Sequence, residues 1–264
     1  MQFQSFASGS SGNCHFVASE ATKLLVDAGI SRKRTSEALA ERGLTLADID
    51  GILITHEHSD HILGLAMLEK ATDIPIYASA GTIRALRRMP PLAHIPEERF
   101  HPVKADEAFV VKDVSVMPFA ISHDAAEPLA FSVRFGGQKV SVCTDLGVYT
   151  AYTAEHLRHS DVMLLEANHD IRMLQMGRYP YPLKQRILGE RGHLSNDASA
   201  KLLLEVLNSH LQAVFLGHLS QENNLPELAY ETVRLELKAS GDKEAAKLPL
   251  YVAERTAPSR YIDF

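Results

Sequence analysis

Short apolar runs separated by turn-forming residues dominate the first half of the chain. Runs of this kind favour β-strands, whereas apolar residues that recur every three or four positions favour helices. The run at 52–54 lies between Gly51 and a polar cluster, which indicates a buried strand that ends in a functional loop. The predicted strands are residues 3–6, 15–17, 23–26, 52–54 and 74–78, and the predicted helices are residues 35–42, 63–71 and 81–88.

Helices and strands alternate in the second half of the chain, after a further group of strands within residues 108–143. Gly136 and Gly137 separate the runs 131–135 and 139–143, which predicts a hairpin. Two strand-and-helix halves in succession predict an α+β fold, the four-layer αβ/βα sandwich, in which two sheets face each other beneath outer helices. The predicted helices of this half are residues 153–159, 197–207 and 226–238, and the strands between them are residues 162–166 and 213–216.

Length and composition are those of an ordinary globular protein. We expect the 264 residues, 1–264, to form a single domain with a substantial core, since 45% of them are hydrophobic and 23% charged. The N-terminal residues show no basic segment followed by an apolar run, and no stretch is apolar for long enough to cross a membrane. A cytoplasmic protein without a membrane partner is therefore predicted. Cys14 and Cys143 are too few for a disulfide scaffold and are expected to be reduced and buried.

The formal net charge of -6 argues against a generally basic nucleic-acid-binding protein, because such proteins neutralise phosphates with many Lys and Arg side chains. Any contact with nucleic acid must therefore be local. Residues 172–191 form one strongly basic segment, with five Lys and Arg residues against Glu190 alone. Shorter basic runs at 32–34 and 84–88 are expected to be solvated helix faces.

Residues 55–61 read Thr-His-Glu-His-Ser-Asp-His, directly after the predicted strand 52–54. Histidine is the commonest ligand of zinc and similar metals, and three imidazoles so close together beside a carboxylate are hard to explain structurally. In an extended segment His56 and His58 point the same way, so they can share one metal ion. Asp60 and His61 lie beyond, where a turn into the next helix can direct them to a second ion.

This segment resembles the His-x-His-x-Asp-His signature of the metallo-β-lactamase superfamily, whose other motifs match in order along nearly the whole chain. Taken singly, the later matching residues would be structural, but their order and strand-end positions indicate ligands. Asp27, in Leu-Leu-Val-Asp-Ala-Gly, matches an aspartate that supports the ligand loop through hydrogen bonds. The resemblance implies two metal ions, with His56, His58 and His123 on the first, Asp60, His61 and His218 on the second, and Asp145 bridging both.

The implied site is hydrolytic. Two neighbouring divalent ions can bind one bridging hydroxide, lower its pKa toward neutrality and stabilise charge on the attacking and leaving oxygens. Zinc suits the imidazole-rich ligand set, and manganese or iron is compatible with the carboxylates.

The superfamily cuts lactams, lactones, thioesters and phosphodiesters, so the substrate must be inferred from other residues. Glu166-Ala-Asn, Gly192-His-Leu-Ser-Asn and His218-Leu-Ser resemble motifs of the ribonuclease Z and phosphodiesterase members. In those members the glutamate orients a histidine that is not a ligand and that gives a proton to the leaving oxygen. The implied catalytic residues are thus Asp60, Glu166 and His193, although His193 is also explained as a turn or capping residue before the helix 197–207.

Across its full length the chain is most similar to the small YycJ/WalJ-like branch of the superfamily, which is proposed to act as a 5′-to-3′ DNA exonuclease. The similarity lies in 8–13, Ser-Gly-Ser-Ser-Gly-Asn, in 166–170, in 179–186, Tyr-Pro-Tyr-Pro-Leu-Lys-Gln-Arg, and in 192–196. Too few residues separate Asp145 from His193 for the large inserted domain of ribonuclease J. Gln221 and Asn223 stand where ribonuclease Z usually has Arg-Tyr, which argues against transfer-RNA processing.

Nucleic acid is the predicted partner, with DNA favoured over RNA, and no oligomeric state is favoured. The predicted substrate contacts come from the loop 8–13, as a backbone nest for a terminal phosphate or simply a tight turn, and from the basic segment. For the tyrosines of that segment, core packing and base stacking are both open. Two alternative functions are a hydrolase of a small ester, lactone or cyclic phosphodiester, and a metal-stabilised regulatory protein without turnover. The residues predicted to bind substrate are Asn13, Arg178, Tyr179 and Lys184.

Overall fold

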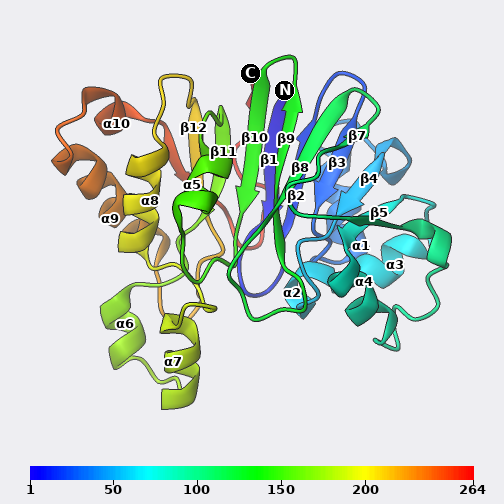
Figure 1. The fold of residues 1–264 in the computed structure, drawn as a ribbon, viewed down its shortest axis with the longest axis horizontal. Coiled ribbons are helices and arrows are strands. Elements are labelled where there is room, and N and C mark those ends of the chain that lie inside the picture. Colours follow the sequence, from blue (N-terminus) through cyan, green and yellow to red (C-terminus); the bar gives the residue numbers. More distant parts are fainter.

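Two seven-stranded sheets face each other at the centre of the protein, whose computed structural model describes residues 1–264 (Figure 1). The first sheet begins as an antiparallel meander and continues with parallel strands. Its order is β14 (Ile262–Asp263), β1 (Gln2–Ala7), β2 (Cys14–Ala18), β3 (Lys23–Val26), β4 (Gly51–Leu53), β5 (Ile76–Ser79) and β6 (Phe100–Val103).

The second sheet is likewise half antiparallel and half parallel. Gly136 and Gly137 both have positive φ and form the predicted turn between its strands β9 and β10. The order of this sheet is β13 (Leu250–Val252), β12 (Ala213–Gly217), β11 (Val162–Glu166), β10 (Gln138–Cys143), β9 (Leu129–Phe135), β8 (Val114–Ala120) and β7 (Phe109–Val111).

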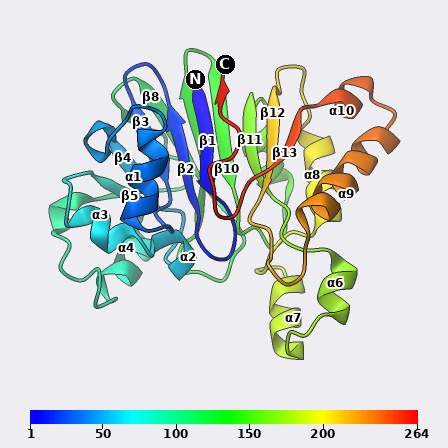
Figure 2. The same cartoon turned by 180° about the vertical axis from the view of Figure 1, so that it is seen from behind.

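Helices cover the outer faces of both sheets (Figures 1 and 2). On the first sheet these are α1 (Arg32–Ala40), α2 (Ser59–Ile62), α3 (Leu65–Glu69) and α4 (Ala80–Arg87), with short 3-10 helices at Leu46–Asp48 and Glu97–Arg99. On the second they are α5 (Ala151–Leu157), α8 (Asn196–Val206), α9 (Pro226–Ala239) and α10 (Lys243–Lys247). The resulting layers confirm the predicted α+β sandwich. Two further helices, α6 (Ile171–Met176) and α7 (Tyr181–Leu188), extend beyond one edge of the sheets.

Three buried apolar clusters hold the layers together, one between the sheets and one beneath each outer layer of helices. Successive side chains of a strand point to opposite faces, so a central strand contributes to two clusters. In β11, Val162 and Leu164 enter the cluster between the sheets, whereas Met163 and Leu165 enter the cluster beneath the helices. Because both faces are buried, this strand is a continuous apolar run in the sequence.

The parallel strands end along one edge of the sandwich, the lower edge in Figure 1. Each of these strands is followed by a loop whose residues face the loops of the neighbouring strands. Polar side chains that are distant in the sequence therefore meet at this edge, as is usual where parallel strands end. The helices α2, α6 and α7 lie at the same edge.

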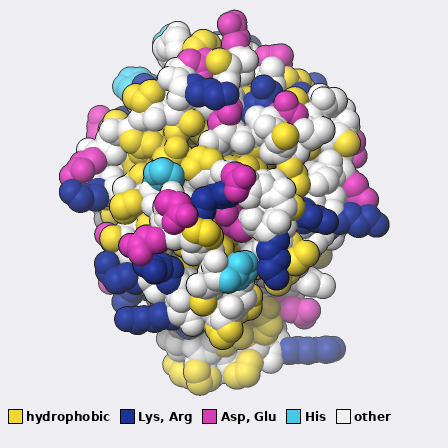
Figure 3. All heavy atoms as spheres, turned by 90° about the vertical axis from the view of Figure 1, so that its right-hand side faces the viewer, with side chains coloured by type: hydrophobic (Ala, Val, Ile, Leu, Met, Phe, Trp, Pro, Cys, Tyr) yellow, Lys and Arg dark blue, Asp and Glu magenta, His cyan; other side chains and the backbone are white.

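The surface agrees with the low and mixed charge of the sequence. Figure 3 shows one side of the molecule, where basic and acidic side chains are interspersed. Arg84, Arg87 and Arg88 are exposed, as a solvated helix face requires, and Arg87 pairs with Glu97 at 3.2 Å. Cys14 and Cys143 are both buried and form no disulfide, as predicted. None of the helices combines the length and apolar character that a membrane crossing needs.

The main difference from the predicted elements lies around Gly64: the helix expected over 63–71 is confined to α3, and a separate helix, α2, precedes it at residues 59–62. A Cβ atom on Gly64 would lie 1.9 Å from the carbonyl oxygen of Ile30, so the backbone approaches another segment at this point. This close contact between two backbone segments depends on the tertiary fold, so the pattern of apolar residues in the sequence does not predict it. The sequence prediction also lacked β6, α6, α7, α10, β13 and β14, which are short and depend on their neighbours.

Candidate metal centre and active site

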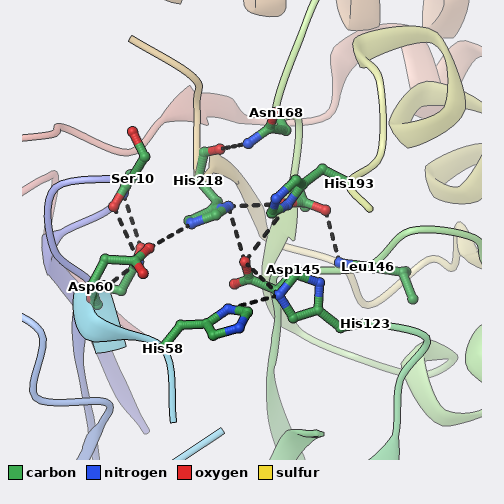
Figure 4. A network of polar contacts seen from close by, with 12 residues as sticks. Ser10, His58, Asp60, His123, Asp145, Leu146, Asn168, His193 and His218 are labelled. Atoms are coloured by element: carbon green, nitrogen blue, oxygen red, sulfur yellow. Dashed lines mark hydrogen bonds and ion pairs between the residues drawn. The ribbon is translucent and has the colours of Figure 1, made fainter. Parts of the chain in front are cut away.

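Seven potential ligands meet at the edge where the parallel strands end. His56, His58, Asp60 and His61 follow β4 and continue into α2, and the other three come from separate loops. Figure 4 shows side chains from these different segments pointing toward one common space. The three additional residues are His123 after β8, Asp145 after β10 and His218 after β12.

Three imidazoles form the first group of potential ligands, His56, His58 and His123. Nδ1 of His58 lies 3.2 Å from Nε2 of His123, and the ring of His56 is 4.6 Å from that of His58 and 4.9 Å from that of His123. Nε2 of His56 is buried and has no hydrogen-bond partner. A hydrogen bond between neutral imidazoles accounts for the contact of His58 with His123 but leaves Nε2 of His56 without a partner, whereas a shared cation would satisfy all three rings.

Asp60, His61 and His218 form a second group. Nε2 of His218 lies 3.2 Å from Oδ2 of Asp60, and Nε2 of His61 lies 3.4 Å from the same oxygen. Two imidazoles and one carboxylate at these distances form a donor set suited to zinc, and the carboxylate also suits manganese.

Asp145 lies between the two groups. Its Oδ1 is 3.7 Å from Nε2 of His123, and its Oδ2 is 3.1 Å from Nε2 of His61. The side chain is buried, and Oδ2 accepts no hydrogen bond from the protein. A buried carboxylate oxygen without a donor is costly unless a cation compensates it, so the residues present fit a metal-binding site.

The second ring nitrogen of His56, His61, His123 and His218 has a partner in the protein. Nδ1 of His61 lies 2.7 Å from Oδ2 of Asp27, which also accepts hydrogen bonds from Thr55. Nδ1 of His123 donates to the carbonyl of Gly192 at 3.2 Å. Partners of this kind fix the ring orientation and leave the opposite nitrogen free to bind a metal.

The electrostatics of the cluster favour a positive charge at its centre. Burial alone would lower the pKa of His218, but the carboxylates of Asp145, Asp60 and Glu166 raise it to about 10. Burial would raise the pKa of Asp60, yet His61 and His218 hold that pKa well below its usual range. The carboxylates therefore stay ionised and stabilise whichever cation lies among them, a proton or a metal ion.

Three residues of the cluster have a backbone conformation that side chains rarely adopt. Asp27, Asp145 and His218 have φ of 63°, 59° and 56°. Left-handed conformations of residues other than glycine cost free energy and are concentrated at functional sites. Here each turns the chain sharply at the end of a strand, so that the side chain points across the edge of the sheets.

The loop that carries Asp60 depends on Gly29. A Cβ atom at Gly29 would lie 1.7 Å from the carbonyl oxygen of Asp60, which accepts a hydrogen bond from the backbone of Asn13 at 2.8 Å. Gly29→Ala should therefore lower the free energy of unfolding by about 3 kcal/mol or more and reduce metal content. Thermal unfolding and metal analysis check this, with Gly136→Asn as a control, because Cβ has open space there and Asn tolerates positive φ. Unchanged stability and metal content in Gly29→Ala would contradict the expectation.

Glu166 connects the metal ligands to His193, and these two residues form a further group of potential ligands with Asp145 and His218. Its buried Oε1 lies 2.9 Å from Nδ1 of His193 and 2.9 Å from Nδ1 of His218. Its Oε2 accepts backbone hydrogen bonds from Leu146 and Leu194 at 2.8 and 3.0 Å. Burial would raise the pKa of Glu166, but the two imidazoles lower it to about 2, so the carboxylate is ionised and orients both rings.

The cluster opens into a cavity of about 210 Å³ between the strand ends and α7. Tyr179 lines it, whereas Arg178 is exposed elsewhere and Lys184 donates a hydrogen bond from Nζ to the carbonyl of Gln175 at 2.7 Å. Asn13 is fully buried, and its Nδ2 lies 3.1 Å from Nε2 of His61, so it holds the loop instead of facing the cavity. The cavity is lined by Ser10, His58, Asp60, Asp145, Asn168, Tyr179, Leu183, Arg186, Ile187, His193, His218 and Ser220.

Several of these residues were not singled out by the sequence. Leu183, Arg186 and Ile187 lie on one face of α7, at the spacing i, i+3 and i+4. Pro182 near the start of that helix is a recognisable N-terminal signal, so a helix prediction over this segment would have placed the three side chains together. The contact of Glu166 with His218 could not be predicted from a local sequence pattern, because the two residues follow different strands.

Comparisons with known proteins agree with this fold. A family model described as a beta-lactamase superfamily domain matches residues 22–215. Exodeoxyribonuclease YycJ of Bacillus anthracis is 37% identical over 250 residues, 94% of each chain, and Exodeoxyribonuclease WalJ of Streptococcus pneumoniae is 37% identical over 232 residues, 88% of this chain and 86% of that one. The crystal structure of zinc-bound PqqB from Methylobacterium extorquens aligns over the full length of both chains, with a TM-score of 0.73 and 14% identity, and shares the fold.

The strand topology, the clustered imidazoles and carboxylates and the family match together define a hydrolase, and the chain belongs to the metallo-β-lactamase superfamily. Its similarity along almost the whole length to YycJ and WalJ places it in the YycJ/WalJ-like branch.

Proposed function

We propose that the chain is a single-domain, cytoplasmic, metal-dependent phosphodiesterase that degrades DNA as a 5′-to-3′ exonuclease. The observation that carries the proposal is the pair of Glu166 and His193. His193 lines the same cavity as the potential ligands, while its Nδ1 is held 2.9 Å from Oε1 of Glu166. An oriented imidazole beside a metal centre is the group that cleavage of an unactivated phosphodiester requires.

Two divalent ions, zinc or manganese, are assigned to the site, with iron as a further candidate. His56, His58 and His123 would hold one ion, Asp60, His61 and His218 the other, and Asp145 both. When bound, the ions would activate a water molecule and stabilise negative charge on the phosphate. Asp27 positions His61 for this role through its contact at 2.7 Å.

His193 would serve as the general acid. With Nδ1 held by Glu166, only Nε2 can face a substrate, and a proton on that atom would pass to the leaving alkoxide oxygen. An alkoxide is a poor leaving group, so this proton contributes typically about 10²–10⁴-fold to the rate. A lactone or lactam needs such help less, which is why the arrangement favours a phosphodiester.

DNA is the proposed substrate because the chain resembles two proteins named exodeoxyribonucleases along nearly its full length. The basic segment supports contact with a polyanion, since its positive side chains lie on α6, α7 and the adjoining loops. Tyr179 lines the cavity and offers an aromatic face on which a base can stack.

Digestion of DNA and RNA labelled at either end, in one titration of zinc and manganese, tests the proposal. Mononucleotides released from the 5′ end of DNA in a metal-dependent reaction are expected. Turnover of a lactone or a small ester in place of nucleic acid would favour the alternative hydrolase. No turnover of any substrate by the metal-loaded protein would favour a regulatory protein.

Replacing Arg178 and Lys184 together with alanine should weaken binding to long DNA far more than it slows a small chromogenic phosphodiester. Each lost phosphate contact should also reduce the slope of log affinity against log salt by roughly 0.7 to 0.9, because fewer counterions are released. Binding measured at several salt concentrations checks this. Equal losses on both substrates would instead indicate a folding defect, which thermal unfolding identifies.

A further inference from the structure

Arg186 is the one arginine that lines the cavity of the metal centre. It lies on α7, on the face that also presents Leu183 and Ile187 to the cavity. The predicted substrate contacts Arg178 and Lys184 do not line it, so the proposed roles of those residues leave Arg186 unexplained.

Asp124 holds the guanidinium of Arg186 in a bidentate pair. Nε of Arg186 contacts Oδ2 of Asp124, and Nη2 lies 3.0 Å from Oδ1. This fork geometry fixes the plane of the guanidinium and uses only part of its five N–H donors. Nη1 donates to no protein atom, and half of the side chain is exposed. The remaining donors are therefore available to a ligand in the cavity.

The segments that carry the pair are themselves braced. Arg191 donates from Nε and Nη2 to the carbonyl of His123 at 3.2 and 3.1 Å, and Oγ of Ser122 donates to the carbonyl of Glu190 at 2.8 Å. These contacts join the loop of residues 122–124 to the residues that follow α7, next to the Arg186–Asp124 pair. The guanidinium is thus fixed relative to His123, a residue of the proposed metal site.

We propose that Arg186 binds a non-bridging oxygen of the phosphate that is cleaved, and that Asp124 positions it for this contact. The inference deepens the proposed function and rests on it. A guanidinium matches the geometry of a phosphate and is always charged, so it adds positive charge where negative charge develops. A neutral lactone offers it no comparable partner, and Arg186 therefore favours phosphodiesters among the substrates of this fold.

Binding of inorganic phosphate to the metal-loaded protein tests the role of Arg186 without requiring turnover. Arg186→Gln should weaken phosphate binding about 10- to 100-fold, the range expected for hydrogen bonds to a charged group. Arg84→Gln is the matched control, because it removes the same charge from an exposed position on α4 outside the cavity, and it should stay within about twofold. Arg186→Lys should recover part of the affinity, since it restores the charge without the fork.

Asp124→Asn tests the positioning role of Asp124 separately from phosphate binding by Arg186. It removes the bidentate pair but keeps the guanidinium. It should weaken phosphate binding less than Arg186→Gln does, with melting temperature unchanged in both variants. Metal content is measured for each variant, because Oδ1 of Asp124 lies 3.6 Å from Nε2 of His123. If Arg186→Gln binds phosphate with wild-type affinity, the proposal is wrong. It is also wrong if Arg186→Gln and Asp124→Asn lose the same phosphate affinity and the same thermal stability. If the wild-type protein binds phosphate through Arg186 but cleaves no phosphodiester, the proposed function fails, and only the binding of phosphate by Arg186 remains.

Discussion

Asp145→Ala should lose both metal binding and turnover, with activity on DNA falling to near background. The carboxylate lies between the two groups of potential ligands, with Oδ1 3.7 Å from His123 and Oδ2 3.1 Å from His61. Without it, each group keeps only its other donors, and two neighbouring cations lose the carboxylate that would compensate their charge. The measurements are metal content per chain after dialysis and the rate of release of labelled nucleotide.

The matched control for this variant is Asp73→Ala. Asp73 is an exposed carboxylate that pairs with Arg99, and it lines no part of the active-site cavity. Its loss should leave metal content and rate within about twofold of wild type, as is usual for exposed ion pairs. If Asp145→Ala still binds two ions per chain, Asp145 does not bridge them. Its Oδ2, which accepts no hydrogen bond, would then need another explanation.

His193→Ala should separate catalysis from metal binding. Both ions should remain, because the one hydrogen bond of the His193 side chain is with Glu166, and Asp145 Oδ1 is 3.6 Å from its Nδ1. Turnover of an unactivated phosphodiester should fall by about 10²–10⁴-fold. With a nitrophenyl leaving group, which departs without a proton, the loss should be much smaller. Steady-state rates on the two substrates, together with metal content, check this, and His210→Ala at an exposed position serves as the control.

Glu166 gives a less specific test of the same mechanism than His193. Oε1 of Glu166 lies 2.9 Å from Nδ1 of both His193 and His218, so Glu166→Gln perturbs the proposed acid and a proposed ligand together. That variant should lower metal affinity as well as turnover. If His193→Ala also loses a metal ion, or slows both substrates alike, His193 is a ligand or a structural residue, and the preference for a phosphodiesterase over a lactonase loses its main support.

The sequence by itself determined the elements whose signals are local. The continuous apolar run of β11 and the glycine pair between β9 and β10 follow from burial on both faces and from backbone conformation, which act over a few residues. The candidate ligands of residues 56–61 were visible for the same reason, since one loop carries them. His123, Asp145 and His218 could be proposed only through their resemblance to a family, because each stands alone in the sequence.

Only the tertiary structure decided which side chains meet. The turn at Gly64 between α2 and α3 fits the close approach of Ile30, and the buried Asn13 contacts Asp60. Glu166 contacts both His193 and His218, and Arg186 contacts Asp124, because parallel strands place loops from distant parts of the chain at one edge. A local sequence pattern predicts the type of a helix or strand, but not how neighbouring strands align with each other. The site depends on that alignment, because it decides which loops meet.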